Sequence, residues 1–170
     1  MIRRPNLDDL KELENFFLLV IKDTYEKEGL GDLIDDIHNE VQEKITYIKE
    51  DLMSDGKKRY FLLATIDNVI VGTAAYGPSG HLIYDHFPEL KDVLELGSVL
   101  VHPEYQSQGV GSKLVDAILN ELRTFKETFC LDSGYTNAKK IWSRKFGQPT
   151  KVLKDFWGDG YDHYIWYKNL

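Results

Sequence analysis

The spacing of apolar residues along the chain predicts both helices and strands. Three segments place an apolar residue at every third or fourth position, which is the period of a helix with one buried face. They are residues 10–21, 34–52 and 114–122. Six shorter runs are rich in β-branched and aromatic residues, which favour strands. They are residues 60–66, 69–76, 95–101, 128–132, 152–157 and 162–168.

Residues with special backbone preferences mark the boundaries of these segments. A short edge strand is expected at residues 1–4, and Asn6 or Asp8 can cap the helix that follows. The pair Asp67 and Asn68 leaves room only for a tight turn, so we expect the strands on either side to form a hairpin.

Glycine and proline end two of the helices. Gly29 and Gly31 stop the first helix, and Gly147 and Pro149 end a further helix predicted over residues 137–146. The elements therefore follow the order β-α-α-β-β-β-α-β-α-β-β. No linker or repeat interrupts them, and this order predicts an α+β fold in one domain.

The composition is that of an ordinary soluble globular protein. The chain has 170 residues, of which 42% are hydrophobic and 29% charged, and this length suffices to bury a core. The net charge of −7 argues against nucleic-acid binding, which needs a basic surface. The longest apolar run, residues 16–21, is far shorter than a membrane span, and one cysteine allows no internal disulfide. We therefore expect a cytoplasmic protein without nucleic-acid or membrane partners.

Residues 95–122 combine a strand, a turn containing Gly109 and Gly111, and the start of a helix. The first N–H groups of a helix have no intrahelical acceptor, and the helix dipole adds partial positive charge there. The segment therefore predicts a site for an anion such as phosphate. A Walker loop would need Gly-Lys-Ser/Thr at its end, and a dinucleotide fingerprint would need a third glycine, so neither motif is present.

The stretch from strand to helix reads VHPEYQSQGVG over residues 101–111. It resembles the acetyl-CoA loop of the GNAT N-acetyltransferase superfamily, whose pattern is Gln/Arg-x-x-Gly-x-Gly/Ala after a strand ending in Val-x-Pro-x-Tyr. The resemblance is specific over residues 95–122 and rests on element order over residues 60–146. It implies a mixed, mostly antiparallel sheet flanked by helices, in which the central strand is splayed from a parallel neighbour.

The resemblance also implies where acetyl-CoA binds. Loop amides would hold the pyrophosphate, and residues 99–101 would hydrogen-bond the pantetheine arm and the oxyanion. In the helix after the fifth strand, one asparagine commonly contacts the cofactor and a hydroxyl can reach the pantetheine. The residues expected to bind acetyl-CoA are Val99, Leu100, Val101, Gln106, Ser107, Gln108, Gly109, Val110, Gly111, Ser112, Asn137 and Ser143.

Two residues are candidates for moving protons. An attacking amine must lose a proton, and the departing thiolate leaves more easily if it gains one. Glu95 opens the central strand, where family members often carry a catalytic glutamate, and alternation places it on one face with Val99 and Val101. The alternative is a solvated strand-end residue. Many members have a tyrosine where Ser143 stands, so Tyr135 is the candidate acid; a packed or capping tyrosine and unaided thiolate departure remain alternatives.

Other reactive side chains have structural explanations. Cys130 lies in the middle of a strand, where a buried thiol is a better explanation than covalent catalysis. His163 either packs within the final hairpin or lines an acceptor pocket. Asp35, Asp36 and His38 fit a solvated helix face better than a metal site, so no metal is expected.

These features predict an enzyme that transfers an acetyl group from acetyl-CoA to a primary amine within a ternary complex. The acceptor, a small molecule or a protein, would be selected by the first two helices, the final hairpin and the irregular residues 81–91. The last segment is either an acceptor-side loop or a packed excursion. The alternative function is a non-catalytic module that binds acyl-CoA as a sensor or interaction partner, and a homodimer is compatible with either.

Overall fold

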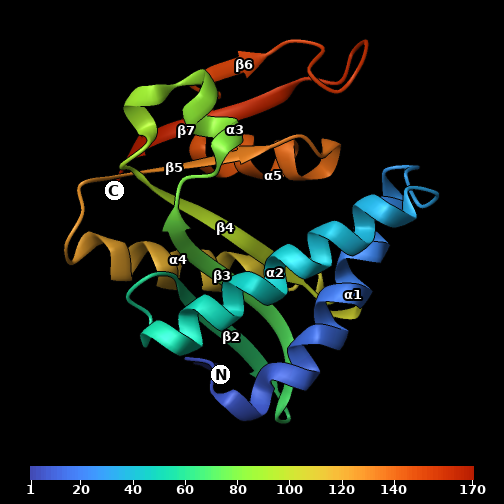
Figure 1. Cartoon of the computed structure of the whole chain (residues 1–170), viewed down its shortest axis with the longest axis vertical. Helices are drawn as coiled ribbons and strands as arrows, with labels where there is room; N and C mark the ends of the chain where they lie inside the picture. Colours follow the sequence, from blue (N-terminus) through green and yellow to red (C-terminus); the bar gives the residue numbers. More distant parts are fainter. The chain divides into compact units, whose positions relative to one another are not determined.

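The computed structural model describes all 170 residues, which Figure 1 traces from the N-terminus to the C-terminus. Its helices are α1 (Leu10–Lys27), α2 (Ile34–Ser54), α3 (His81–His86), α4 (Val110–Arg123) and α5 (Thr136–Phe146). Its strands are β1 (Ile2–Arg3), β2 (Tyr60–Ile66), β3 (Val69–Pro78), β4 (Leu94–Val101), β5 (Thr128–Ser133), β6 (Lys151–Leu153) and β7 (His163–Asn169). None of the helices is both long and apolar enough to cross a membrane.

The chain forms two compact units. The first comprises Met1–Gly77 and Gly97–Glu121, and the second comprises Pro78–Leu96 and Leu122–Leu170. Residues 97–101 of β4 therefore belong to the first unit and residues 94–96 to the second. The prediction of a single domain stays a prediction.

In the first unit, β1 pairs with β2 and β2 pairs with β3, both antiparallel. The register places Ile66 opposite Val69, so Asp67 and Asn68 form the hairpin turn. Their φ angles are 50° and 65°, as expected for a two-residue turn that matches the twist of the strands. The predicted hairpin is confirmed.

Helices α1 and α2 pack against each other in the first unit (Figure 1). Both bury the apolar face that the sequence predicts. The buried residues on these faces include Leu13, Phe17, Val20 and Ile21 of α1 and Ile37, Val41, Ile45 and Ile48 of α2. Asn6 caps the short 3₁₀ turn Leu7–Asp9 that leads directly into α1, with its side chain accepting a hydrogen bond from the Asp8 amide. Ile34 is 62% exposed, so the predicted apolar face of α2 is wrong in its first turn.

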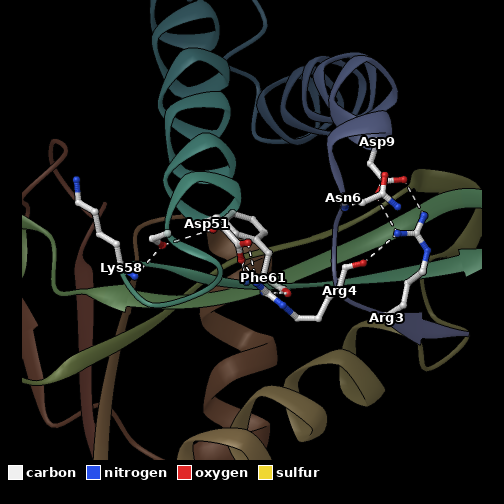
Figure 2. A network of polar contacts seen from close by, with 8 residues as sticks. Arg3, Arg4, Asn6, Asp9, Asp51, Lys58 and Phe61 are labelled. Atoms are coloured by element: carbon white, nitrogen blue, oxygen red, sulfur yellow. Dashed lines mark hydrogen bonds and ion pairs between the residues drawn. The ribbon is translucent and has the colours of Figure 1, made fainter.

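Arg4 joins the N-terminal segment to α2 and β2 through an ion pair whose carboxylate is buried. Its guanidinium donates to both carboxylate oxygens of Asp51, at 2.6 and 2.8 Å, and to the carbonyl oxygen of Phe61 at 2.7 Å (Figure 2). The Asp51 side chain is 1% exposed and also accepts a hydrogen bond from the Phe61 amide. Arg3 forms a second two-pronged pair with Asp9, with both contacts at 2.7 Å. The contacts of Arg4 thus connect the N-terminal segment with the C-terminal end of α2 and the start of β2.

In the second unit, β4 runs parallel to β5, with Glu95 opposite Cys130. Strand β5 pairs with β7, and β7 pairs with β6, both antiparallel. The parallel neighbour of the central strand is therefore confirmed. Since the other pairs described in both units are antiparallel, the predicted α+β class with mostly antiparallel strands is confirmed as well.

Residues 81–91 form α3 and a short 3₁₀ turn at Pro88–Leu90 instead of an irregular loop. Ile83 and Leu90 of this segment are buried in a cluster with Cys130 and Ile165. The segment is therefore packed, as one of the two alternatives proposed, because it covers the apolar residues of β5 and β7.

Strand β6 ends at Leu153, four residues earlier than predicted. The chain turns at Asp155, whose φ is 52° and whose side chain accepts a hydrogen bond from the Gly160 amide at 2.6 Å. The Asp155 amide in turn donates to the Asp162 carboxylate at 2.9 Å. Side-chain hydrogen bonds to the backbone thus close the loop before a longer ladder can form.

Candidate functional site

The turn between β4 and α4 belongs to the first unit and is exposed over residues 106–109. Ser107 and Gly109 have φ angles of 60° and 84°, both in the left-handed region. The first backbone hydrogen bond of α4 runs from the Lys113 amide to the Gly109 carbonyl oxygen, at 3.0 Å. The amides of residues 110–112 therefore precede the helical ladder, which is the arrangement that binds anions at a helix N-terminus.

The two glycines of this turn are required for different reasons. A Cβ added at Gly109 would meet nothing within 4 Å, so its requirement is the positive φ. A Cβ added at Gly111 would lie 3.3 Å from Cγ2 of Val101. The backbone angle is thus the reason for glycine at position 109, whereas at Gly111 close packing of α4 on β4 supplies the reason.

Both glutamines of the turn hold its backbone. Gln106 donates through Nε2 to the Val101 carbonyl oxygen at 3.1 Å, and Gln108 donates through Nε2 to the Glu104 carbonyl oxygen at 2.9 Å. The structure therefore brings together residues 101–112, the main part of the predicted cofactor-binding set. Their side chains shape the loop, and the amides are left to contact a ligand.

Gly72 of β3 supports this turn and was missed from the sequence. A Cβ at this position would lie 2.8 Å from Leu114, 3.0 Å from Val110 and 3.3 Å from the Leu100 carbonyl oxygen. Only glycine lets the first turn of α4 approach the strands so closely. An isolated glycine inside a β-branched run was the signal that could have indicated this close approach.

The central strand departs from extended backbone at Ser98, whose φ is 50°. The Ser98 carbonyl oxygen accepts a buried hydrogen bond of 2.7 Å from the hydroxyl of Thr73. A left-handed residue breaks the two-residue repeat of a strand, so the predicted alternation from Glu95 to Val101 is wrong beyond Gly97. Residues 99–101 consequently follow a kink in β4.

Glu95 lies in the second unit and is half-buried. Its Oε2 accepts a hydrogen bond from the Gly80 amide at 2.6 Å. This contact orients the carboxylate, which distinguishes Glu95 from a fully solvated strand-end residue. Its assignment as the base stays a prediction.

Cys130 is fully buried opposite Glu95, and its thiol points to the carbonyl oxygens of Val93 and Leu94 at 3.9 and 3.7 Å. Burial, with smaller contributions from the charges of Glu95 and Asp132, raises the pKa of the Cys130 thiol far above its ordinary value. A thiol held neutral is a poor nucleophile, so the structure supports the packing explanation over covalent catalysis.

The remaining candidates lie at both ends of α5, in the second unit. Tyr135 is the half-buried N-cap residue, with extended backbone and no side-chain cap hydrogen bond. Asn137 is exposed in the first turn, and Ser143 is half-buried near the C-terminal end. Asn137 and Ser143 are six residues apart, about 9 Å along the axis and about 120° around it, so the helix does not bring them to one face.

His163 is 4% exposed, and both of its ring nitrogens have partners. Nδ1 accepts a hydrogen bond from the Trp157 indole at 3.1 Å, and Nε2 lies 3.0 Å from the Asp132 carboxylate. This pairing requires the proton on Nε2 in the neutral ring. Gly134 lies against the same group, since a Cβ there would be 2.5 Å from the indole nitrogen. These contacts support packing of His163 over a role in lining a pocket.

No group of three or more His, Cys, Asp or Glu side chains is placed to hold a metal ion. Asp35, Asp36 and His38 are exposed on α2, as expected for a solvated helix face.

The comparison with known proteins identifies the family. The sequence profile of the acetyltransferase (GNAT) family matches residues 19–147, and the chain belongs to this family. No curated protein matches the chain in sequence.

Solved structures share the fold. PaiA N-acetyltransferase from Thermoplasma acidophilum, in complex with coenzyme A, is 19% identical, with a TM-score of 0.71 over 100% of this chain and 98% of that one. Ribosomal-protein-alanine N-acetyltransferase from Brucella melitensis is 23% identical, with a TM-score of 0.70 over 100% and 99%. YncA from Salmonella typhimurium, with its cofactor acetyl-CoA, is 17% identical, with a TM-score of 0.69 over 100% and 93%.

Proposed function

We propose that this chain transfers an acetyl group from acetyl-CoA to a primary amine. The observation that carries the proposal is the exposed turn between β4 and α4, with left-handed Ser107 and Gly109 before the free amides of the helix start. The solved structures of PaiA and YncA, which share this fold, contain coenzyme A and acetyl-CoA. The turn suits a doubly charged pyrophosphate because it offers several N–H donors and no acidic side chain between residues 105 and 112.

In this proposal each part of the chain has a separate task. The amides of residues 107–112 hold the pyrophosphate, and Asn137 and Ser143 contact the rest of the cofactor. The amides of residues 99–101 hydrogen-bond the pantetheine arm, and one of them stabilises the negative charge that develops on the thioester oxygen. The kink at Ser98 interrupts the extended backbone just before these residues.

The cosubstrate supplies an acetyl thioester. The amine nitrogen forms a bond to the acetyl carbon while the carbon–sulfur bond breaks, giving an amide and coenzyme A. Glu95 accepts the proton that the amine must lose, through a water molecule. Tyr135 is proposed to protonate the departing sulfur. Cys130 takes no part, because its thiol is buried and neutral.

A second function has one observation in its favour. Ser143 stands where many family members have the proton-donating tyrosine, and Tyr135 lies at the opposite end of α5. A chain without an acid would be suited to bind acyl-CoA as a sensor and not to turn it over. The acid affects only the ease of thiolate departure, so the enzyme remains the better supported proposal.

Release of free thiol from acetyl-CoA tests the enzyme directly. The wild-type chain is incubated with acetyl-CoA and pools of amino acids, polyamines, aminoglycosides and peptides with free N-termini. We expect thiol release above the no-amine background with at least one pool, and mass spectrometry should show acceptor mass increased by one acetyl group. Tight binding of acetyl-CoA with no acetylated product in any pool would favour the sensor.

A further inference from the structure

The turn between β4 and α4 has one side-chain partner from outside the β4–α4 segment. Lys27, in the last turn of α1, donates from Nζ to Oε1 of Gln106 at 3.2 Å. The same ammonium lies 2.7 Å from the Asp23 carboxylate, one helical turn earlier. Asp23 thus directs Lys27 toward the turn, and all three residues belong to the first unit.

This contact holds the oxygen end of the Gln106 side-chain amide. An ammonium can only donate, so it selects the amide oxygen of Gln106. The NH₂ group is then directed to the Val101 carbonyl oxygen, to which it donates at 3.1 Å. The Val101 carbonyl oxygen can only accept, so it favours the same orientation of the amide. Without the lysine, the exposed Gln106 side chain keeps this one contact but loses the second, and the hydrogen bond that closes the turn at the end of β4 is held less firmly.

We infer that Lys27 is a positioning residue for the coenzyme A loop. It acts through Gln106 on the backbone of residues 101–107, and Asp23 orients it. The inference rests on the proposed function, because it assigns Lys27 to the loop proposed to bind the pyrophosphate. Lys27 is 46% exposed, so its contribution is that of one solvent-accessible charged hydrogen bond.

Lys22 provides a matched control. It lies five residues earlier on α1 and lines an open hollow of about 520 Å³ between α1 and residues 102–104. It therefore carries the same charge near the same turn but does not hold Gln106. A general effect of positive charge on an anionic ligand should appear in both lysines, whereas positioning should appear only in Lys27.

Isothermal titration with coenzyme A tests the inference on the full chain. We expect Lys27→Met to raise the Kd about fivefold, Lys27→Arg to stay within about twofold of wild type, and Lys22→Met to stay within about twofold. Gln106→Met should raise the Kd by a similar factor. Because both residues act through the same contact, the double variant Lys27→Met/Gln106→Met should have a Kd no higher than that of the weaker-binding single variant. Without ligand, the melting temperatures of wild type and Lys27→Met should agree within about 2 °C.

Three outcomes are separable. A Lys27→Met variant that binds as tightly as wild type, or no more weakly than Lys22→Met, overturns the inference and leaves the proposed function intact. Binding of coenzyme A with the expected pattern of Kd values, but without acetyl transfer, would contradict the proposed enzymatic activity and support the positioning role of Lys27. Failure of the wild-type chain to bind coenzyme A overturns both.

Discussion

The Oε2 atom of Glu95 lies 2.6 Å from the backbone nitrogen of Gly80 and accepts its hydrogen bond. This hydrogen bond fixes the orientation of the Glu95 carboxylate. Residue 95 also lies opposite Cys130 on a parallel strand, where the backbone is fixed by pairing. The position is therefore rigid enough for a base that works on one substrate geometry.

Glu95→Gln tests this role. Glutamine keeps an oxygen that can accept from the Gly80 amide, so the fold and the Kd for acetyl-CoA should be unchanged. Because the amide cannot take up a proton, kcat should fall by about 10²- to 10⁴-fold, measured by thiol release. Glu89→Gln, which changes an exposed carboxylate of the same unit, serves as the control and should retain wild-type kcat. Equal turnover in wild type and Glu95→Gln would remove Glu95 as the base.

Gly109→Trp tests the cofactor loop. Any side chain at a φ of 84° strains the backbone, at a cost of about 1–3 kcal/mol, and an indole here would also obstruct the loop amides. We expect a folded protein whose Kd for coenzyme A is raised at least tenfold. Gly160→Ala is the matched control, because it has a φ of 80° with open space around it and lies in the β6–β7 loop. Gly160→Ala should lower the free energy of unfolding and leave the Kd for coenzyme A unchanged. A folded Gly109→Trp variant with the wild-type Kd would contradict the assignment of the β4–α4 turn as the coenzyme A site.

Arg4→Met should destabilise the fold strongly. It would leave the charge of Asp51, whose side chain is 1% exposed, buried without its cationic partner. Breaking a buried pair in this way costs about 3–5 kcal/mol, and partial exposure of Arg4 places the expected loss at about 3 kcal/mol in urea unfolding.

Lys58→Met is the control for Arg4. Lys58 pairs with Glu50 at 3.1 Å, but its side chain is 63% exposed, so its removal should change the free energy of unfolding by less than about 1 kcal/mol. Similar decreases in the free energy of unfolding of Arg4→Met and Lys58→Met would show that the Arg4–Asp51 pair stabilises the fold no more than an exposed pair does.

Cys130 predicts a dependence of stability on pH. Burial raises the pKa of its thiol in the folded chain, whereas the unfolded thiol ionises near pH 8.5. Above that pH the unfolded chain loses a proton that the folded chain keeps, so the free energy of unfolding should fall by up to about 1.4 kcal/mol per pH unit. Below about pH 8.5 the thiol is protonated in both the folded and the unfolded chain, so the free energy of unfolding does not depend on its ionisation there.

Cys130→Ala isolates this effect. The variant should be less stable than wild type at pH 7, because a buried sulfur is lost, but the difference should shrink as the pH rises from 8 to 10. Urea unfolding of wild type and Cys130→Ala at several pH values measures the difference in free energy of unfolding at pH 7 and its change with pH. Parallel loss of stability in the two chains over this range would contradict the assignment of the raised pKa to this thiol.

Local patterns predicted most of the fold. The 3.6-residue period of α1, α2 and α4 and the Asp67-Asn68 turn are determined by residues close together in sequence. The short β6 and the packed residues 81–91 were not predictable in the same way. The end of β6 depends on hydrogen bonds of the Asp155 side chain and amide within its own loop, which the hydrophobic pattern does not report. The packing of residues 81–91 depends on burial against β5 and β7, which are distant in sequence.

In the candidate site, too, features encoded by contiguous residues were predictable, and features set by contacts between distant residues were not. The β4–α4 turn has a motif of contiguous residues, so its geometry followed from the sequence. The kink at Ser98 depends on the Thr73 hydroxyl, 25 residues away in sequence, and a β-branched run gave no sign of it. Nothing in the local sequence indicates that Asp51 is buried, and only the fold shows that Arg4 reaches it. Lys27 was missed for the same reason, because its contact with Gln106 joins residues 79 positions apart.

The most direct test of the account is the melting temperature of the wild-type chain with and without acetyl-CoA. A ligand that binds only the folded state at 100 times its Kd adds about 2.7 kcal/mol, which corresponds to a rise of about 5–10 °C for a chain of this size. The account predicts such a rise, abolished or much reduced in Gly109→Trp and preserved in Glu95→Gln. No rise at millimolar acetyl-CoA in the wild-type chain would contradict the assignment of the β4–α4 turn as the cofactor site, and the proposed function would be lost with it.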